Sequence, residues 1–397
     1  MAEITVHRTP LGAPGLKTLP PLSLYLHIPW CVRKCPYCDF NSHEQKGELP
    51  ETEYCAALLR DLELSLPLTW GRRVYSIFIG GGTPSLFSAS AIDEILSGVR
   101  SLLPLANDCE VTLEANPGTF EAEKFRDFHA AGVTRLSIGV QSFNPRHLKA
   151  LGRIHDDGQA RRAIEAAAHA FDNFNLDVMY ALPGQTLDEA LDDVRQAISW
   201  QSTHLSFYHL TIEPDTVFFR RPPVVPDADA SALIEEAVHG ALREAGFDQY
   251  ETSAFARHGR RCRHNLNYWE FGDYLGLGAG AHSKISFPDR IIRQTRTKQP
   301  REYLKRVAEG EPVLEEKTLQ RGDAVFEFMM NALRLSDGFP VTLFQERTGL
   351  PISAASKPLD VAEARGLILR DHLRIAPTEL GRRFLNDLLE LFLPEKR

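Results

Sequence analysis

The sequence predicts an α/β protein with a parallel sheet and a smaller C-terminal domain. From residue 24 to about residue 210, apolar β-rich runs alternate with amphipathic segments that repeat apolar residues at i, i+3 and i+4. Strands separated by helices indicate a parallel sheet, either open or bent into part of a barrel. Polar and glycine-rich motifs follow the strands, at the edge where parallel α/β folds bind ligands.

Length, composition and charge favour a globular protein of two domains that does not bind nucleic acid. The chain has 397 residues and is 43% hydrophobic, which is enough for two domains. Its net charge of −8, with basic residues scattered along it, argues against nucleic acid as a partner. Apolar residues do not run long enough to predict a transmembrane segment, and we expect a cytoplasmic protein. Residues 1–19 are expected to form a loose, proline-containing arm.

The elements can be placed in order. A first strand runs from Leu24 toward the cysteines near residue 31. The further predicted strands are Val74–Ile79, Glu110–Ala115, Thr134–Val140, Phe174–Met179 and His204–Leu210. The helices between them are predicted at Thr52–Leu66, Ala91–Leu103, Phe120–Ala131, Gln159–Phe171 and Leu187–Trp200.

Three thiols follow the first strand. Cys31, Cys35 and Cys38 stand in a C-x3-C-x2-C spacing within one short loop. Thiolates suit a soft metal centre, and a [4Fe-4S] cluster takes four ligands. Three cysteines therefore leave one iron open for a small molecule that supplies an amine and a carboxylate. S-adenosylmethionine (SAM) is such a molecule.

Two other interpretations of the thiols stay open. A zinc site would use His43 as its fourth ligand, although structural zinc sites usually draw their ligands from two separated pairs. Disulfides fit less well, because three neighbouring cysteines cannot pair internally and no export signal precedes them. The isolated Cys55, Cys109 and Cys262 are expected to be small buried side chains.

At Tyr25–Phe40 the sequence resembles the radical SAM superfamily, in its oxygen-independent coproporphyrinogen oxidase branch, and is most similar to the HemW-type heme chaperones. The resemblance implies an incomplete (β/α)6 barrel, a [4Fe-4S] cluster on the three cysteines, and SAM. We expect a core at residues 20–247, a barrel-closing segment at 248–300, and a C-terminal winged-helix-like domain at 301–397.

Several motifs are candidates for the SAM pocket. Gly80–Thr83 follows the second strand and lets the backbone approach a ligand closely, although a plain tight turn is the simpler alternative. Arg153 suits the methionyl carboxylate. Helix caps or surface ion pairs are the alternative for the acidic residues. The resemblance assigns SAM to Tyr25, Gly81, Gly82, Thr83, Glu114, Gln141, Arg153 and Asp177.

A glycine-rich, aromatic stretch follows the core, from His264 to His282. It contains a His-Asn-x-x-Tyr-Trp motif that the resemblance associates with heme. Histidine is a common heme ligand and aromatic rings stack on the macrocycle, so His264 is the leading candidate. His209, His282 and Cys262 are rivals. Alternatively, Tyr268 and Trp269 are core aromatics and His264 orients a loop.

The last hundred residues predict helices around a small hairpin, which is typical of a winged-helix-like module. After a helical connector at Arg301–Leu314, helices are expected at Ala324–Leu335, from Thr342, at Val361–Gly366 and from Thr378 to about Leu391, with a hairpin at Leu367–Thr378. The mixed charge disfavours DNA binding, so we expect a lid or a docking domain.

Three functions remain, and one residue separates the first two. The first is a heme chaperone that delivers heme to apo-hemoproteins, membrane-associated respiratory enzymes among them. The second is an oxygen-independent coproporphyrinogen III oxidase, whose branch typically has a further cysteine where this chain has Phe40. Phe40 therefore favours the chaperone. A radical SAM enzyme with another substrate is a third alternative.

Overall fold

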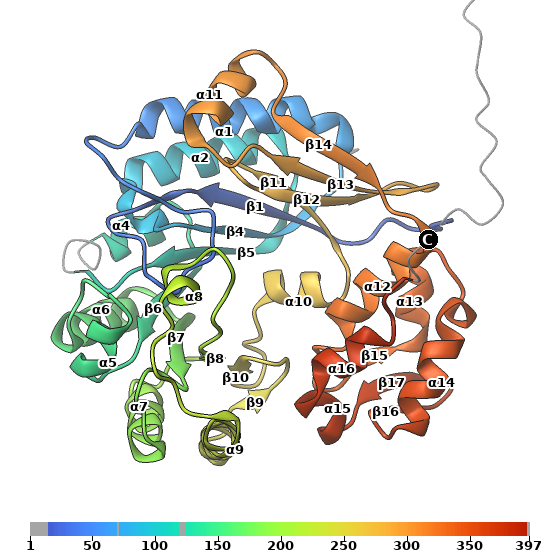
Figure 1. The fold of residues 1–397 in the computed structure, drawn as a ribbon. Coiled ribbons are helices and arrows are strands. Elements are labelled where there is room, and N and C mark those ends of the chain that lie inside the picture. The colour runs from blue at the N-terminus through green and yellow to red at the C-terminus, as the bar shows by residue number, and fades with distance from the viewer. Residues whose placement is uncertain (1–14, 70, 119–123, 395–397) are drawn as a thin grey trace, which may run out of the picture.

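The computed structural model describes residues 15–69, 71–118 and 124–394 and contains one large sheet with helices packed along its outside (Figure 1). Six parallel strands lie side by side in chain order, and further strands extend the sheet at both edges without closing it. The predicted α/β fold with a parallel sheet is confirmed, and among the described residues the sheet is open. The six strands are β1 (Leu22–Ile28), β4 (Val74–Gly81), β5 (Leu105–Ala115), β6 (Arg135–Gln141), β7 (Phe174–Tyr180) and β8 (His204–His209).

Several of the outer helices begin at capping residues, and most pack on the next outer helix along the chain. Ser88 caps α2, and Asp156 and Thr186 form capping boxes at α6 and α7. The predicted helix at Phe120–Ala131 lies partly outside the described residues. The outer helices are α1 (Glu51–Ser65), α2 (Ala89–Leu102), α4 (Phe125–Ala130), α6 (Asp157–Ala170), α7 (Leu187–Ser199) and α9 (Ala228–Glu244).

Alternation along the parallel strands separates an apolar face from a polar one. In β1, Leu22, Leu24, Leu26 and Ile28 are buried in the main core with the outer helices. Side chains of a strand point alternately to opposite faces, so Ser23, Tyr25 and His27 face the inner side of the sheet. The same holds for the other parallel strands, and the inner side is therefore lined by polar groups.

The chain after β8 extends the sheet at both edges. Strand β11 (Asp273–Leu277) lies parallel to β1, and β12 (His282–Ser286), β13 (Ile291–Arg296) and β14 (Val313–Thr318) follow it as antiparallel neighbours. On the other edge, β10 (Ala254–Ala256) pairs with β8 and β9 (Asp248–Gln249) pairs with β10. The region predicted as a helical connector consists of α11 (Pro300–Ala308) followed by β14, which belongs to the large sheet. The domain limits at residues 247 and 300 stay a prediction.

The C-terminal domain has its own core and lies beside the N-terminal ends of the parallel strands (Figure 1). The last predicted helix is interrupted at Phe384, whose ψ of 46° is not helical. In the described part of the chain, no helix is long and apolar enough to cross a membrane. The elements are α12 (Arg321–Ala332), β15 (Phe339–Pro340), α13 (Val341–Thr348), α14 (Ser356–Ala364), β16 (Ile368–Arg370), β17 (Arg374–Pro377), α15 (Glu379–Arg383) and α16 (Leu385–Glu390).

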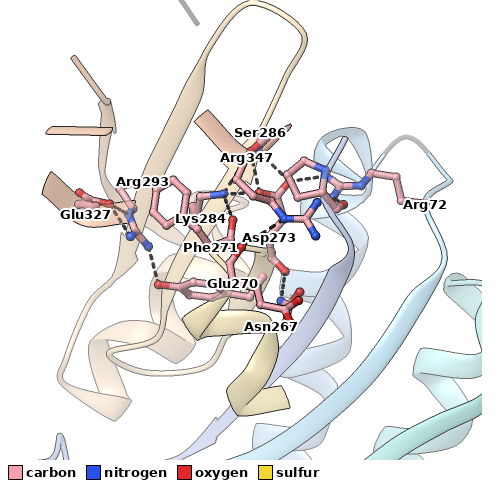
Figure 2. A network of polar contacts seen from close by, with 12 residues as sticks. Arg72, Asn267, Glu270, Phe271, Asp273, Lys284, Ser286, Arg293, Glu327 and Arg347 are labelled. Atoms are coloured by element: carbon pink, nitrogen blue, oxygen red, sulfur yellow. Dashed lines mark hydrogen bonds and ion pairs between the residues drawn. The ribbon is translucent and has the colours of Figure 1, made fainter. Parts of the chain in front are cut away.

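A buried polar network joins this domain to the sheet (Figure 2). Asp273, at the start of β11, accepts hydrogen bonds from Lys284 Nζ at 2.8 Å and Arg72 Nη1 at 2.7 Å. Arg347 of α13 donates to the carbonyl of Glu270 at 3.2 Å. These contacts fix the turn that leads into β11.

Candidate functional site

A cavity of about 370 Å³ opens at the carboxyl ends of the parallel strands and extends along the inner side of the sheet. The structure brings most of the predicted site residues together here, whereas Tyr25 and His264 do not line the cavity. Those in the lining are Cys31, Cys35, Cys38, Gly81, Gly82, Thr83, Glu114, Gln141, Arg153 and Asp177.

The three thiols lie at the mouth of this cavity. Thr83 Oγ1 donates to Cys31 Sγ at 3.5 Å, and Arg153 Nη1 donates to Cys35 Sγ at 3.6 Å. Burial raises the pKa of the thiols of Cys31 and Cys38 above the usual range. A bound metal would deprotonate them, and the two donors would stabilise the resulting sulfur charge. The donor set of three neighbouring thiols with hydrogen-bonded sulfurs fits an iron–sulfur cluster.

The loop that carries the thiols is held by the far end of the chain. Asn41 Nδ2 donates to the carbonyls of Ala279 and Lys298, each at 2.9 Å. His43, the residue that the zinc interpretation needs, bonds the carbonyl of Lys298 through Nε2 at 3.1 Å and lines a different cavity. Among the residues that the structure describes, no three His, Cys, Asp or Glu side chains converge to hold a single metal ion.

The glycines Gly81 and Gly82, at the end of β4, are required by close packing. Gly81 has a φ of 115°, and a Cβ there would lie 2.5 Å from the His27 ring. A Cβ on Gly82 would lie 2.5 Å from the carbonyl oxygen of Trp30, just before Cys31. Only glycine lets this loop rest against β1 and the thiol loop while its backbone faces the cavity. The loop is therefore a tight turn and also part of the cavity wall.

Two carboxylates, Glu114 and Asp177, face the cavity from β5 and β7. Glu114 accepts the amide of Gly81 at 3.0 Å, and burial, assisted by the charge of Asp177, raises its pKa to about 7. Asp177 accepts hydrogen bonds from Ser137, Asn175 and Tyr208 at 2.9, 2.8 and 3.1 Å. Burial raises the pKa of Asp177, and these three donors oppose the rise. Neither carboxylate is a helix cap or a surface ion pair.

Arg153 and Asn116 connect these elements at the cavity mouth. Arg153 Nη2 donates to Asn116 Oδ1 at 2.6 Å and to the carbonyl of Gly139 at 2.8 Å. Asn116 Nδ2 in turn donates to Thr83 Oγ1 at 2.8 Å. Gln141, at the end of β6, has a φ of 70°, a strained backbone conformation for a residue with a side chain. The mouth is thus a hydrogen-bonded ring that joins the thiol loop to three strands.

Tyr25 lies behind the cavity wall. Its hydroxyl bonds His27 Nδ1 at 2.9 Å, and its ring stacks at 6.3 Å on Phe78, which does line the cavity. His27 Nε2 bonds the carbonyl of Asn41 at 2.9 Å. Both ring nitrogens of His27 are therefore used within the fold, which indicates a structural role for this residue.

His264 is also enclosed. It lies in α10 (Arg263–Trp269), and only 1% of it is exposed. Its Nδ1 bonds Ser76 Oγ at 3.1 Å and its Nε2 bonds Tyr268 Oη at 3.0 Å. Burial, with the nearby charge of Arg135, lowers its pKa to about 3. The imidazole is neutral, the form that ligates iron, but both nitrogens already have partners.

Helix α10 lies on the inner side of the sheet, opposite the outer helices (Figure 1). Glu110 Oε1 accepts the amide of Arg263 at 2.9 Å and the thiol of Cys262 at 3.6 Å, and Asn265 lines the cavity. Among the rival heme ligands, Cys262 is fully buried, His282 is exposed away from the cavity, and His209 is exposed and lines it.

The lining also contains residues to which the sequence analysis gave no binding role, among them Asn116, Arg135 and Tyr208. Asn116 follows Glu114 at a strand end, so its position was a usable signal. Tyr208 lies in the last parallel strand and shares its inner face with Ser206. Arg135 is a lone charge at the start of an apolar strand, and only the strand register reveals that it faces inward.

Comparisons with known proteins identify the family of the chain. The radical SAM superfamily model matches residues 25–197, and the HemN C-terminal domain model matches residues 319–384. The chain is 53% identical to the heme chaperone HemW of Escherichia coli (strain K12), over 95% of this chain and 99% of that protein. It is 50% identical to the heme chaperone HemW of Haemophilus influenzae, over 95% and 99% of the two chains.

A solved structure shares the fold over nearly the whole chain. The coproporphyrinogen III oxidase HemN of Escherichia coli superposes with a TM-score of 0.80 at 23% identity, covering 94% of this chain and 90% of that one. At this identity the likeness extends to the fold alone. The extended similarity to the two bacterial relatives is decisive, and the chain belongs to the HemW family of heme chaperones within the radical SAM superfamily.

Proposed function

We propose that the protein binds heme and delivers it to apo-hemoproteins, membrane-associated respiratory enzymes among them. The observation that carries this proposal is the 53% identity, over nearly the whole length of both chains, to a protein named a heme chaperone. We place this activity in the cytoplasm, where reducing conditions keep exposed thiols available for a metal centre.

The cavity mouth is the proposed site of a [4Fe-4S] cluster and SAM. Cys31, Cys35 and Cys38 would ligate the cluster, and the open iron would take the SAM amine and carboxylate. When bound, the reduced cluster supplies the electron that cleaves SAM. Around it, the glycine loop, Glu114, Gln141 and Asp177 offer acceptors for the amine and the ribose hydroxyls, and Tyr25 supports the wall through Phe78. Arg153 lies between the thiol loop and β6 and is the proposed partner of the methionyl carboxylate.

Coproporphyrinogen III oxidase activity is the alternative function. Phe40 stands where that branch typically has a cysteine, and its side chain is 58% exposed at the cavity mouth. We expect no decarboxylation of coproporphyrinogen III by the reduced, cluster-loaded protein with SAM in the absence of oxygen. Sustained turnover would replace the chaperone proposal with the oxidase.

His264 stays our proposed heme ligand, with His209 as its rival. Iron at His264 Nε2 requires Tyr268 to give up its hydrogen bond, which would also free that hydroxyl to reach the macrocycle. Iron at His209 requires no such change, since that side chain is exposed in the cavity lining. The two therefore differ in whether α10 must rearrange.

A heme titration tests the function and the ligand together. Cluster-reconstituted wild type is titrated with heme beside His264→Ala, His209→Ala and His169→Ala, the last an exposed histidine on α6. Saturable, stoichiometric binding with an altered Soret band in one of the first two variants, and not in His169→Ala, supports the chaperone and names the ligand. Absence of saturable binding in the wild type removes the proposal.

A further inference from the structure

A buried arginine, for which the described residues provide no hydrogen-bond partner, lies in the cavity lining at the start of β6. Arg135 is the first residue of β6, and its side chain is on the same strand face as Ser137 and Gln141, both of which line the cavity with it. Only 2% of Arg135 is exposed, and among the described residues Arg135 and Arg296 are the two largest side chains that are fully buried.

The comparison with Arg296 shows how a buried guanidinium is normally accommodated. Arg296 donates to Asp61 Oδ1 at 3.0 Å, to Ser65 Oγ at 2.9 Å and to Gln294 Oε1 at 3.0 Å. For Arg135, the described part of the chain provides no hydrogen bond and no ion pair, and its Nε is enclosed without an acceptor. A guanidinium without acceptors is costly to bury, so buried charges are normally paired.

The acidic groups near Arg135 are committed elsewhere. Glu110 accepts from Arg263 and Cys262, and Asp177 accepts from Ser137, Asn175 and Tyr208. Their charges act on Arg135 from a distance, but they do not bond its N–H groups. The other neighbours whose pKa the charge of Arg135 affects are Tyr250, Cys262, His204 and His264. All four are neutral when buried, and none accepts a hydrogen bond from it.

We propose that Arg135 binds a carboxylate of a small molecule in this cavity. A planar guanidinium with free N–H groups matches a carboxylate in paired geometry, and a buried site strengthens that bond. Asn265 of α10 lines the same cavity and adds a polar amide to its wall. The inference deepens the proposed function, because a heme propionate is the favoured source of the carboxylate. The methionyl carboxylate of SAM is the second source, and Arg135 would then replace Arg153 as its proposed partner.

Paired ligands separate the two sources. Binding of heme and of heme dimethyl ester, and of SAM and of decarboxylated SAM, is measured for cluster-reconstituted wild type, Arg135→Gln and Arg135→Lys. Arg263→Gln is the matched control. It removes the guanidinium at the start of α10, which pairs with Asp108 at the surface and not with a ligand in the cavity. Iron content and thermal denaturation establish that each variant is folded and loaded. If Arg135→Gln does not fold, Arg135→Lys still tests the site, because it keeps the charge and removes the planar guanidinium.

We expect Arg135→Gln to weaken heme binding by about tenfold to a hundredfold, with the ester unaffected and Arg135→Lys intermediate. A loss confined to SAM, and absent for its decarboxylated analogue, also supports the carboxylate site and assigns it to SAM. Equal losses for acid and ester, or no loss for either ligand, overturn the inference. If the wild type fails to bind heme, the proposed function is wrong. The comparison of SAM with decarboxylated SAM then tests by itself whether Arg135 binds a carboxylate.

Discussion

Two buried polar regions of this protein differ in how completely their hydrogen bonds are satisfied. In the network beside the C-terminal domain, the carboxylate of Asp273 accepts bonds from Arg72, Lys284 and both the amide and hydroxyl of Ser286 (Figure 2). Burial alone would raise the pKa of Asp273, but the charges of Lys284 and Arg72 hold it below the usual range. In the cavity, by contrast, Arg135 has no partner among the described residues, and the pKa of Glu114 is raised to about 7.

The difference separates a structural role from a binding role. A saturated network stabilises the fold only as long as every member is present, because removing one leaves a buried charge unpaired. An unsaturated one leaves donors and protons available for a ligand. The region in Figure 2 therefore holds α10 and β11 in place, and the cavity is the region that is available to bind a ligand.

The largest effect is expected at the cavity mouth. Cys35→Ala removes one of three thiols that line the cavity and should abolish [4Fe-4S] incorporation, because two thiolates are too few to hold the cluster. Iron and sulfide analysis with visible absorption after reconstitution measures the loss. Cys109→Ala, which removes a half-buried thiol outside the cavity, should keep full occupancy. Equal cluster content in both variants would refute the assignment of the loop.

The saturated network should respond in stability. Asp273→Ala leaves Lys284, of which 1% is exposed, without its counter-charge and should reduce the free energy of unfolding by about 3–5 kcal/mol. Urea denaturation of both proteins gives the difference. Asp289→Ala, which breaks the exposed pair with Arg290, should cost less than about 1 kcal/mol. A loss for Asp273→Ala no greater than this control would show that the network contributes little.

The cavity carboxylate should appear in the pH dependence of stability. Folding raises the pKa of Glu114 from 4.5 to about 7, so between these values the folded state holds a proton that the unfolded state has lost. Stability from this group therefore falls as pH rises from 4.5 to 7, by about 3 kcal/mol in total. Glu114→Gln removes this decline in stability. The pKa of Asp193 is also raised to about 7, and the decline that Asp193 causes persists in both the wild type and the variant. If the stability of the wild type and of Glu114→Gln changed equally with pH, Glu114 would not be a buried carboxyl with a raised pKa.

The smallest effect tests one bond within the network. Arg293 Nη1 donates to Tyr274 Oη at 2.5 Å, and Arg293 also pairs with Glu327 of α12. Tyr274→Phe removes the first contact and keeps the second, so we expect a loss of about 1 kcal/mol in urea denaturation. Glu327→Gln weakens the second contact, the ion pair between Arg293 and Glu327. A larger loss in Tyr274→Phe than in Asp273→Ala would show that the tyrosine hydroxyl, and not the buried carboxylate, dominates the network.

Sequence patterns predicted the fold well because they report local geometry. The helical spacing of apolar residues and the apolar β-rich runs act within a few residues, so most predicted strands and helices coincide with observed ones, although β5 begins at Leu105 and not at Glu110. The strand β14 was missed because its pattern is nearly all exposed, and only pairing with β13 makes it a strand. The interruption at Phe384 likewise has no local signal.

The site was predictable only in part. Motif spacing and strand order brought the thiols, the glycines, Glu114 and Asp177 to one end of the sheet. Arg135 was missed, since its importance depends on which carboxylates are already engaged by others. His264 was expected from residue type and resemblance, but the engagement of both its nitrogens with Ser76 and Tyr268 depends on three-dimensional packing.

The anchoring of the thiol loop by Asn41 has a consequence for synthesis on the ribosome. Its partners, Ala279 and Lys298, emerge more than two hundred residues later, as does β11, the parallel neighbour of β1. Contacts this distant in sequence form late, so the cysteines of the growing chain stay unconstrained while most of the protein is being made. Cluster insertion is then expected to follow release of the C-terminal half, and truncated chains that end before residue 279 should fail to retain iron.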